Sequence, residues 1–156
     1  MDLLAFFNWL DASFLARMSK AYGGVFAVVQ MFHLLALVLL GGAVVAGALR
    51  MLGVLLRDVP RALVLAGTWR VFDVALVLIV ISGIFMSSAV AMKLYYNEMF
   101  WVKMAGLLVG MVFMYGIERP LLRRPQSGAW PTRLVACASL ATWFTVAAAG
   151  RWIGFS

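Results

Sequence analysis

Long runs of apolar residues, separated by short polar and basic connections, dominate the chain. These runs lie at about residues 25–49, 71–92, 99–117 and 134–153. A helix of roughly 20 residues crosses a hydrocarbon core about 30 Å thick, so each run is long enough to span a membrane. Because consecutive spans with short links pack against one another, the pattern predicts an all-α, integral membrane, antiparallel four-helix bundle. Residues 1–156 are then expected to form a single membrane domain.

The first twenty residues have a different pattern, in which polar side chains interrupt the apolar ones. Asn8, Asp11, Ser13 and Arg17 divide a segment that is rich in aromatic residues. This mixture is typical of an amphipathic helix that lies in the plane of the membrane interface. We therefore expect an interfacial helix over residues 3–20, and the alternative is a lid packed on the end of the bundle.

Small residues recur four positions apart in two of the runs, which favours close helix packing. The third run contains Gly106 and Gly110, and the segment 41–48 of the first run is also rich in glycine and alanine. Such residues let helices approach each other closely in lipid. On a helical wheel Lys103 shares the face of the two glycines. This lysine is expected either to face a neighbouring helix or to extend its ammonium group to the nearby surface.

Composition supports a membrane protein. Hydrophobic residues make up 65% of the chain and charged residues only 12%. A soluble domain has about 25% charged residues, so these values favour a lipid bilayer as the main partner. The net charge of +7 comes from basic residues that flank the spans, which argues for anionic lipid rather than nucleic acid. The single cysteine, Cys137, excludes an intrachain disulfide.

The distribution of basic residues predicts the orientation. The first and third connections carry Arg50, Arg57, Arg61, Arg70, Arg119, Arg123, Arg124 and Arg133, whereas the opposite side has Arg17, Lys20, Lys93, Lys103 and Arg151. The positive-inside rule places the first and third connections in the cytoplasm and both termini outside. All four prolines also fall in these two connections, where they are not expected to interrupt a span.

His33 is the only histidine, and it lies within the first apolar run beside Gln30. An ionisable side chain at membrane depth is costly and usually has a function. Imidazole is a ligand for haem iron, copper or zinc, and one axial histidine is enough for a haem. Lys103 and Arg151 lie near the same surface, where they are expected to pair with haem propionates. Alternatively, His33 is structural and bonds to a serine or a carbonyl group.

Patterns for several other kinds of chemistry are missing from the sequence. Asp58, Asp73, Glu98 and Glu118 are all expected to lie outside the deep part of a span. The sequence has no Ser/His/Asp arrangement, phosphate-binding loop or dinucleotide fingerprint. Hydrolytic and kinase activities are therefore not expected, and proton-coupled transport is disfavoured.

Short motifs give the chain a resemblance to known families. Gly41-Gly42 and Leu49-Arg50 follow His33, residues 100–103 (FWVK) open the third run, and residues 150–153 (GRWI) close the fourth. This set resembles an uncharacterised family of small bacterial four-helix inner-membrane proteins. It is similar, more distantly, to the membrane protoporphyrinogen oxidase family and to the copper-resistance D-type proteins.

The resemblance implies a cofactor and a location. In the oxidase family a histidine of the first helix and a lysine of the third form the functional pair, associated with haem b, and they correspond to His33 and Lys103. Both families carry further histidines, and this chain has none. The resemblance therefore implies a haem b-binding protein of the bacterial inner membrane with periplasmic termini, used for electron transfer rather than porphyrinogen oxidation.

Three hypotheses about function follow. The first is a haem b-binding redox protein or oxidoreductase subunit, with His33 as the metal ligand on the outer side and quinone or a periplasmic electron carrier as its partner. A second axial ligand would come from another subunit or from Met86, Met99 or Met104. The second hypothesis is a non-catalytic accessory subunit that packs against a larger membrane complex. Apart from this hypothesis, another membrane subunit or a second copy of the chain is an expected partner. The third hypothesis is a small transporter or metal-handling protein.

Overall fold

The computed structural model describes residues 2–124, 128–153 and 155. Within these residues the chain forms helices and no strand, which confirms the prediction of an all-α fold. The elements in chain order are α1 (Leu3–Asp11), α2 (Phe14–Ala21), α3 (Gly23–Met51), α4 (Arg61–Ala89), α5 (Ala91–Tyr95), α6 (Glu98–Phe113), the π-helical turn η1 (Met114–Glu118), α7 (Arg119–Leu122) and α8 (Ala129–Trp152).

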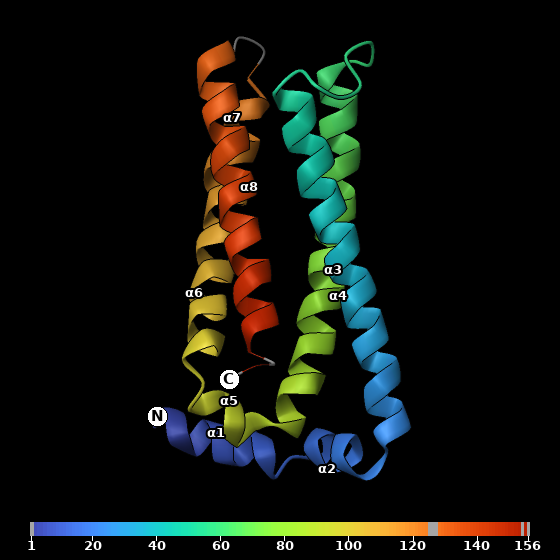
Figure 1. Ribbon diagram of the computed structural model, residues 1–156, viewed down its shortest axis with the longest axis vertical. Coiled ribbons are helices and arrows are strands. Elements are labelled where there is room, and N and C mark those ends of the chain that lie inside the picture. The colour runs from blue at the N-terminus through green and yellow to red at the C-terminus, as the bar shows by residue number, and fades with distance from the viewer. Residues whose placement is uncertain (1, 125–127, 154, 156) are drawn as a thin grey trace.

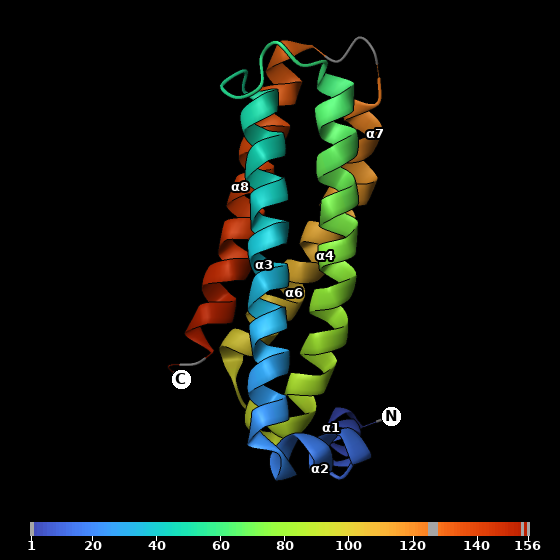
Figure 2. The ribbon, with the colours of Figure 1, turned by 90° about the vertical axis from the view of Figure 1, so that its right-hand side faces the viewer.

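Four helical segments of the described chain are long and apolar enough to cross a membrane. They are α3, α4, the continuous segment from α6 through α7, and α8, and they run side by side as a bundle (Figure 1, Figure 2). The protein is therefore a multi-pass membrane protein. Helices α1, α2 and α5 lie at one end of the bundle with the last turn of α8, and we call this the termini end. The opposite end, which carries the connection 52–60 and α7, is called the basic end.

All four spanning helices begin before the apolar runs that predict them, and the difference is largest for α4 and α8. Helix α4 starts at Arg61 rather than Val71, and α8 starts at Ala129 rather than Leu134. Arginine is a good helix former, and its long side chain reaches a polar environment while the backbone stays helical. The Arg61 guanidinium donates a hydrogen bond to the Leu122 carbonyl oxygen at 3.3 Å. The basic connections thus contribute helical turns that hydropathy alone does not reveal.

Pro120 lies within a helix, and so does Pro131 in the first turn of α8, which corrects the expectation that every proline falls in a connection. Pro120 occupies α7, directly after the π-helical turn η1. A proline has no N–H group, and its ring clashes with the carbonyl group four residues earlier, here that of Gly116 within η1. A π turn widens the helix at that place and is a common way to accommodate such a break. The third span therefore continues to Leu122, beyond the expected end at Ile117.

The N-terminal segment forms two helices rather than the single helix expected over residues 3–20. Ser13 separates them, because its hydroxyl oxygen accepts a hydrogen bond from the Ala16 N–H at 3.2 Å and caps α2. A serine at this position satisfies a backbone donor that a continuous helix would use otherwise. Phe7 of α1 is buried and packs against Ala91 and Leu94 of α5. The segment therefore lies across the termini end, as Figure 1 shows.

Most of the bundle core lies between α3, α4 and α8. Its central cluster combines Ala36, Leu40, Ala43 and Val44 of α3 with Phe72, Ala75, Leu76 and Ile79 of α4, Met114 of η1, and Trp143 and Val146 of α8. Helix α6 packs against α8 through its glycines, as their spacing predicts. A Cβ atom on Gly106 would lie 3.0 Å from Val146, and one on Gly110 would lie 3.1 Å from Trp143. Only residues without a side chain fit this contact.

Candidate functional site

His33 lies in the termini half of α3 and faces the interior of the bundle. Its exposed fraction is only 8%, whereas Phe32 and Leu34 on either side are largely exposed. Ala36 and Leu40, which follow on the same face of the helix, belong to the central core cluster. The helical period therefore turns the single imidazole away from lipid and toward the other helices.

One hydrogen bond joins His33 to α4. The ring Nδ1 lies 2.7 Å from the hydroxyl oxygen of Ser82, and that hydroxyl donates to the Leu78 carbonyl oxygen at 2.5 Å. Because the serine proton is used in the second bond, the serine oxygen accepts the bond from a protonated Nδ1. Nε2 then carries no proton, and no described residue bonds to it. The structure thus presents the imidazole as a ligand with one free lone pair.

Lys103 shares the termini half of the bundle with His33. Its side chain is half-buried on the face of α6 that packs against α8, and its Nζ lies 3.5 Å from the position of a Cβ atom on Gly150. The ammonium group is near enough to act electrostatically on the His33 ring. Among the described residues, Lys103 makes no salt bridge. The structure therefore places His33 and Lys103 in the same half of the bundle, with the lysine at the contact between α6 and α8.

The other two predicted site residues lie at the surface. Gln30 is exposed on α3, one turn before the buried His33. Arg151 is exposed in the last turn of α8, and its guanidinium carbon lies 4.4 Å from the ring centre of Phe155. Neither side chain is therefore buried with His33.

The structure also contains a polar cluster that the sequence did not predict. Asp73 of α4 receives two hydrogen bonds from the Arg119 guanidinium, at 2.6 and 3.1 Å, and one from the Tyr115 hydroxyl at 2.6 Å. We call these three residues the Asp73–Arg119 cluster. It joins α4 to the end of the third span near the basic end. Paired donation of this kind fixes the geometry of an arginine–carboxylate contact.

Aromatic rings surround the guanidinium of this cluster. The Arg119 carbon lies 4.3 Å from the ring centre of Tyr115, 5.5 Å from that of Trp69 and 5.8 Å from that of Phe72. Ring faces attract a cation, especially where water is excluded. The arginine side chain is only 11% exposed, and the Asp73 side chain is 45% exposed. The rings thus hold a buried cation while its carboxylate remains partly accessible.

Glu118 is buried between helices, although the sequence places it in a polar connection after the third run. Its exposed fraction is 4%, and it lies four residues from the end of the continuous helical segment from α6 through α7. Hydropathy did not reveal this burial, because the apolar run ends at Ile117, whereas the helix and its packing continue.

The sequence did hold a usable signal for the Asp73–Arg119 cluster. Tyr115 and Arg119 are four residues apart and so share a helix face.

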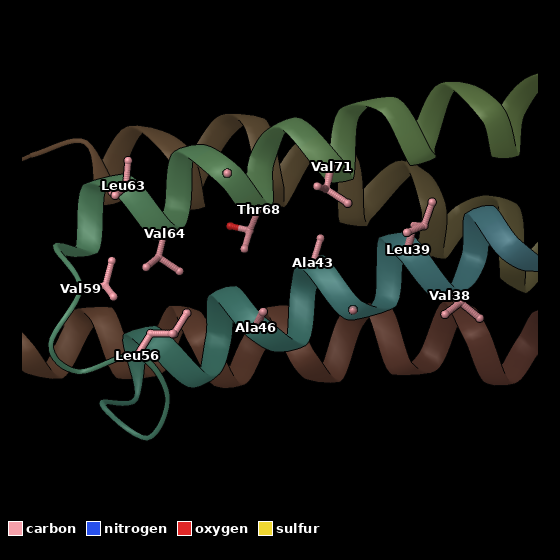
Figure 3. A pocket seen from close by; sticks show the side chains of 12 residues that line it. Val38, Leu39, Ala43, Ala46, Leu56, Val59, Leu63, Val64, Thr68 and Val71 are labelled. Carbon is pink, nitrogen blue, oxygen red and sulfur yellow. The ribbon is translucent and has the colours of Figure 1, made fainter.

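Shallow apolar grooves follow the outer seam between α3 and α4. The larger, of about 570 Å³, is lined by Gly42, Ala43 and Ala46 of α3 and by Gly67 and Thr68 of α4, among others (Figure 3). Leu39 lines both this groove and a second one of about 330 Å³, which extends toward Ser82. With almost no polar atoms, these grooves suit lipid tails.

The family comparison covers nearly the whole chain. A family model described as a family of unknown function, DUF6644, matches residues 6–156. This protein belongs to the DUF6644 family. No curated protein and no solved structure gives a significant match to it. For this DUF6644 protein, the candidate site therefore rests on the geometry of His33, Ser82 and Lys103.

Proposed function

We propose that this DUF6644 protein binds haem b within the membrane and serves in electron transfer, alone or as a subunit of an oxidoreductase. The observation that supports this proposal best is the orientation of His33. A buried imidazole whose Nδ1 proton is bonded to Ser82, with Nε2 unprotonated and unbonded, has the form of a metal ligand held by a supporting partner.

The residues around His33 suit a porphyrin better than a bare metal ion. Among the described residues, no three His, Cys, Asp or Glu side chains converge on a metal site. A porphyrin supplies four ligands of its own, so a single histidine is sufficient. Bound haem supplies reversible one-electron chemistry at its iron.

Within this proposal, His33 would hold the iron through Nε2 and Ser82 would keep the ring in one orientation. Lys103 lacks a salt-bridge partner in the described chain, and it would pair with a propionate. Arg151 would offer a second cation at the surface. Gln30 has no part in the proposal, because it is exposed.

The distant similarity to the protoporphyrinogen oxidase and copper-resistance families supports the same pair of residues. His33 and Lys103 correspond to the functional pair of the oxidase, and the absence of further histidines favours electron transfer over porphyrinogen oxidation. We also propose a bacterial inner membrane as the location, with the arginine-rich basic end in the cytoplasm and both termini in the periplasm. The site then lies on the outer side, where quinone or a periplasmic carrier is the proposed electron partner.

An absorption spectrum of the purified protein tests this function. After expression with ample haem, we expect a Soret band together with sharp α and β bands on reduction by dithionite. His33→Ala is expected to abolish these bands, because no other imidazole is present. Gln30→Ala is the matched control, one turn away on the same helix but exposed, and it should leave the spectrum unchanged.

A featureless spectrum would contradict the proposal. In that case the accessory-subunit hypothesis gains support if the colourless protein purifies with partners in fixed stoichiometry. Equal loss of haem from both variants would also contradict a specific role for His33.

A further inference from the structure

Glu118 is the most deeply buried carboxyl group of the described chain, and the proposed redox function does not use it. It ends the π-helical turn η1, one residue before Arg119, and its exposed fraction is 4%. Turns of this type are frequent at functional sites. An ionised carboxyl group is energetically costly to bury in a membrane protein, so burial bears on the protonation state of Glu118.

The groups that face this carboxyl satisfy it only in part. Ser139 of α8, itself 1% exposed, forms a hydrogen bond with it. The Trp69 indole of α4 also lies beside it, although neither the indole N–H nor the Glu118 Oε2 atom has a partner with hydrogen-bond geometry among the described residues. One carboxyl oxygen is therefore buried without a partner.

The nearby positive charges are already engaged elsewhere. The Arg119 guanidinium donates to both carboxylate oxygens of Asp73 and to the Trp69 carbonyl oxygen. Arg61 donates to the Leu122 carbonyl oxygen, and Arg123 lies exposed against the Trp69 ring at 5.8 Å. None of these arginines makes a salt bridge with Glu118.

The two acidic residues of this region differ in whether a positive charge is bonded to them. The single negative charge of Asp73 matches the single positive charge of Arg119 at bonding distance. A second negative charge, on Glu118, would be buried beside the Ser139 hydroxyl with no salt-bridge partner among the described residues. The neighbouring Arg119 also acts on it electrostatically, but the charge of this arginine is already matched by Asp73. Burial of this kind strongly favours the neutral form of a carboxyl group.

We propose that Glu118 is a proton-binding site inside the membrane bundle and that it holds a proton at neutral pH, whereas Asp73 is ionised. The ligand is a single proton, bound on a carboxyl group between α4, the third span and α8. This site is distinct from the His33 site, because it lies toward the basic end. Proton binding at Glu118 does not depend on whether the protein binds haem.

Infrared spectroscopy at neutral pH tests this proposal directly. The C=O stretch of a protonated carboxyl group absorbs apart from that of a carboxylate, and the chain has only six Asp and Glu side chains. We expect one protonated-carboxyl band in the wild-type protein and its complete loss in Glu118→Gln, which keeps the size of the side chain. The matched control is Glu98→Gln, the same substitution at an exposed carboxylate of α6, which should retain the band.

A wild-type spectrum without the band, a band that survives in Glu118→Gln, or a band that is lost in Glu98→Gln would overturn the proposal. If Glu118→Gln fails to fold, a labelling experiment on the wild-type protein tests whether Glu118 is protonated. Dicyclohexylcarbodiimide partitions into membranes and reacts with protonated carboxyl groups. The carboxyl oxygen adds to the central carbon of the reagent, the acid proton moves to a reagent nitrogen, and the adduct rearranges to a stable acylurea.

Mass spectrometry then locates the label. Modification of Glu118 with Asp73 unmodified supports the proposal, whereas an unmodified Glu118 overturns it. Neither measurement depends on haem, so a failure here is distinguishable from a failure of the proposed redox function.

Discussion

The two halves of the bundle treat their polar side chains in opposite ways. At the termini end, His33 has one hydrogen bond, and neither its second ring nitrogen nor Lys103 has a bonded partner among the described residues. Toward the basic end, Asp73 receives three hydrogen bonds and aromatic rings enclose Arg119. An unbonded ring nitrogen suits a site that binds something, whereas the ion pair of Asp73 and Arg119 suits a joint that holds helices together. The joint is not saturated throughout, because Arg119 Nε, the Trp69 indole N–H and Glu118 Oε2 have no partner among the described residues.

The two regions also differ in how tightly their side chains are packed. A Cβ atom on Gly83 would lie 3.6 Å from the His33 ring, which is an ordinary contact distance. A Cβ atom on Gly110 would lie 3.1 Å from Trp143, whose ring stacks edge-on against Phe72 at 5.0 Å. The Asp73–Arg119 cluster therefore rests on a tightly packed aromatic layer, whereas Gly83 meets the His33 ring at an ordinary packing distance.

The largest effect is expected from removal of the cation in the Asp73–Arg119 cluster. Arg119→Ala deletes both hydrogen bonds to Asp73 and empties the aromatic enclosure. We expect a loss of about 3 kcal/mol in the free energy of unfolding, near the lower limit for a buried pair because Asp73 is partly exposed. Unfolding in mixed detergent micelles measures this loss. Arg123→Ala is the control, since this exposed arginine should contribute less than about 0.5 kcal/mol. Equal losses of unfolding free energy in the two variants would show that the Asp73–Arg119 cluster stabilises the protein no more than an exposed arginine does.

An intermediate effect is expected from a pair of glycine substitutions. Gly110→Ala forces the added methyl group against Trp143, and overpacking of this kind costs about 1–2 kcal/mol. Gly83→Ala meets only an ordinary contact with His33, so its unfolding free energy should stay within about 0.5 kcal/mol of the wild-type value. Thermal unfolding of both proteins in the same detergent provides the comparison. A larger loss at Gly83 would show that the histidine site is the tighter region.

The smallest effect on stability is expected at the histidine site. Ser82→Ala removes the partner of the His33 Nδ1–H group and should cost about 1 kcal/mol. If His33 binds haem, the same change should weaken haem affinity about tenfold, because the ring loses its supporting partner. Haem titration measures this change. Ser88→Ala is the matched control, since Ser88 is a buried serine of the same helix that bonds only to the Phe85 carbonyl oxygen. Equal weakening in both variants would contradict a supporting role for Ser82.

The amino-acid sequence by itself determined the class of the fold and the existence of one unusual residue. Hydropathy is a local property, so the apolar runs predict four spans and an all-α membrane bundle. The spacing of Gly106 and Gly110 predicts a close helix contact, and the structure finds it against α8. The sequence also shows, without any tertiary information, that His33 is a single histidine within an apolar run and hence a candidate functional residue.

Only the tertiary structure decided which side chains meet. His33 and Ser82 are 49 positions apart in the chain, and Asp73 and Arg119 are 46 apart. Their contacts depend on how each helix is rotated about its axis and how far it extends, and no local pattern encodes either quantity. Hydropathy ends the third span at Ile117, yet the helix continues through a π turn and buries Glu118. Packing between helices fixed these pairs, because burial in lipid and burial in protein look the same in an apolar sequence.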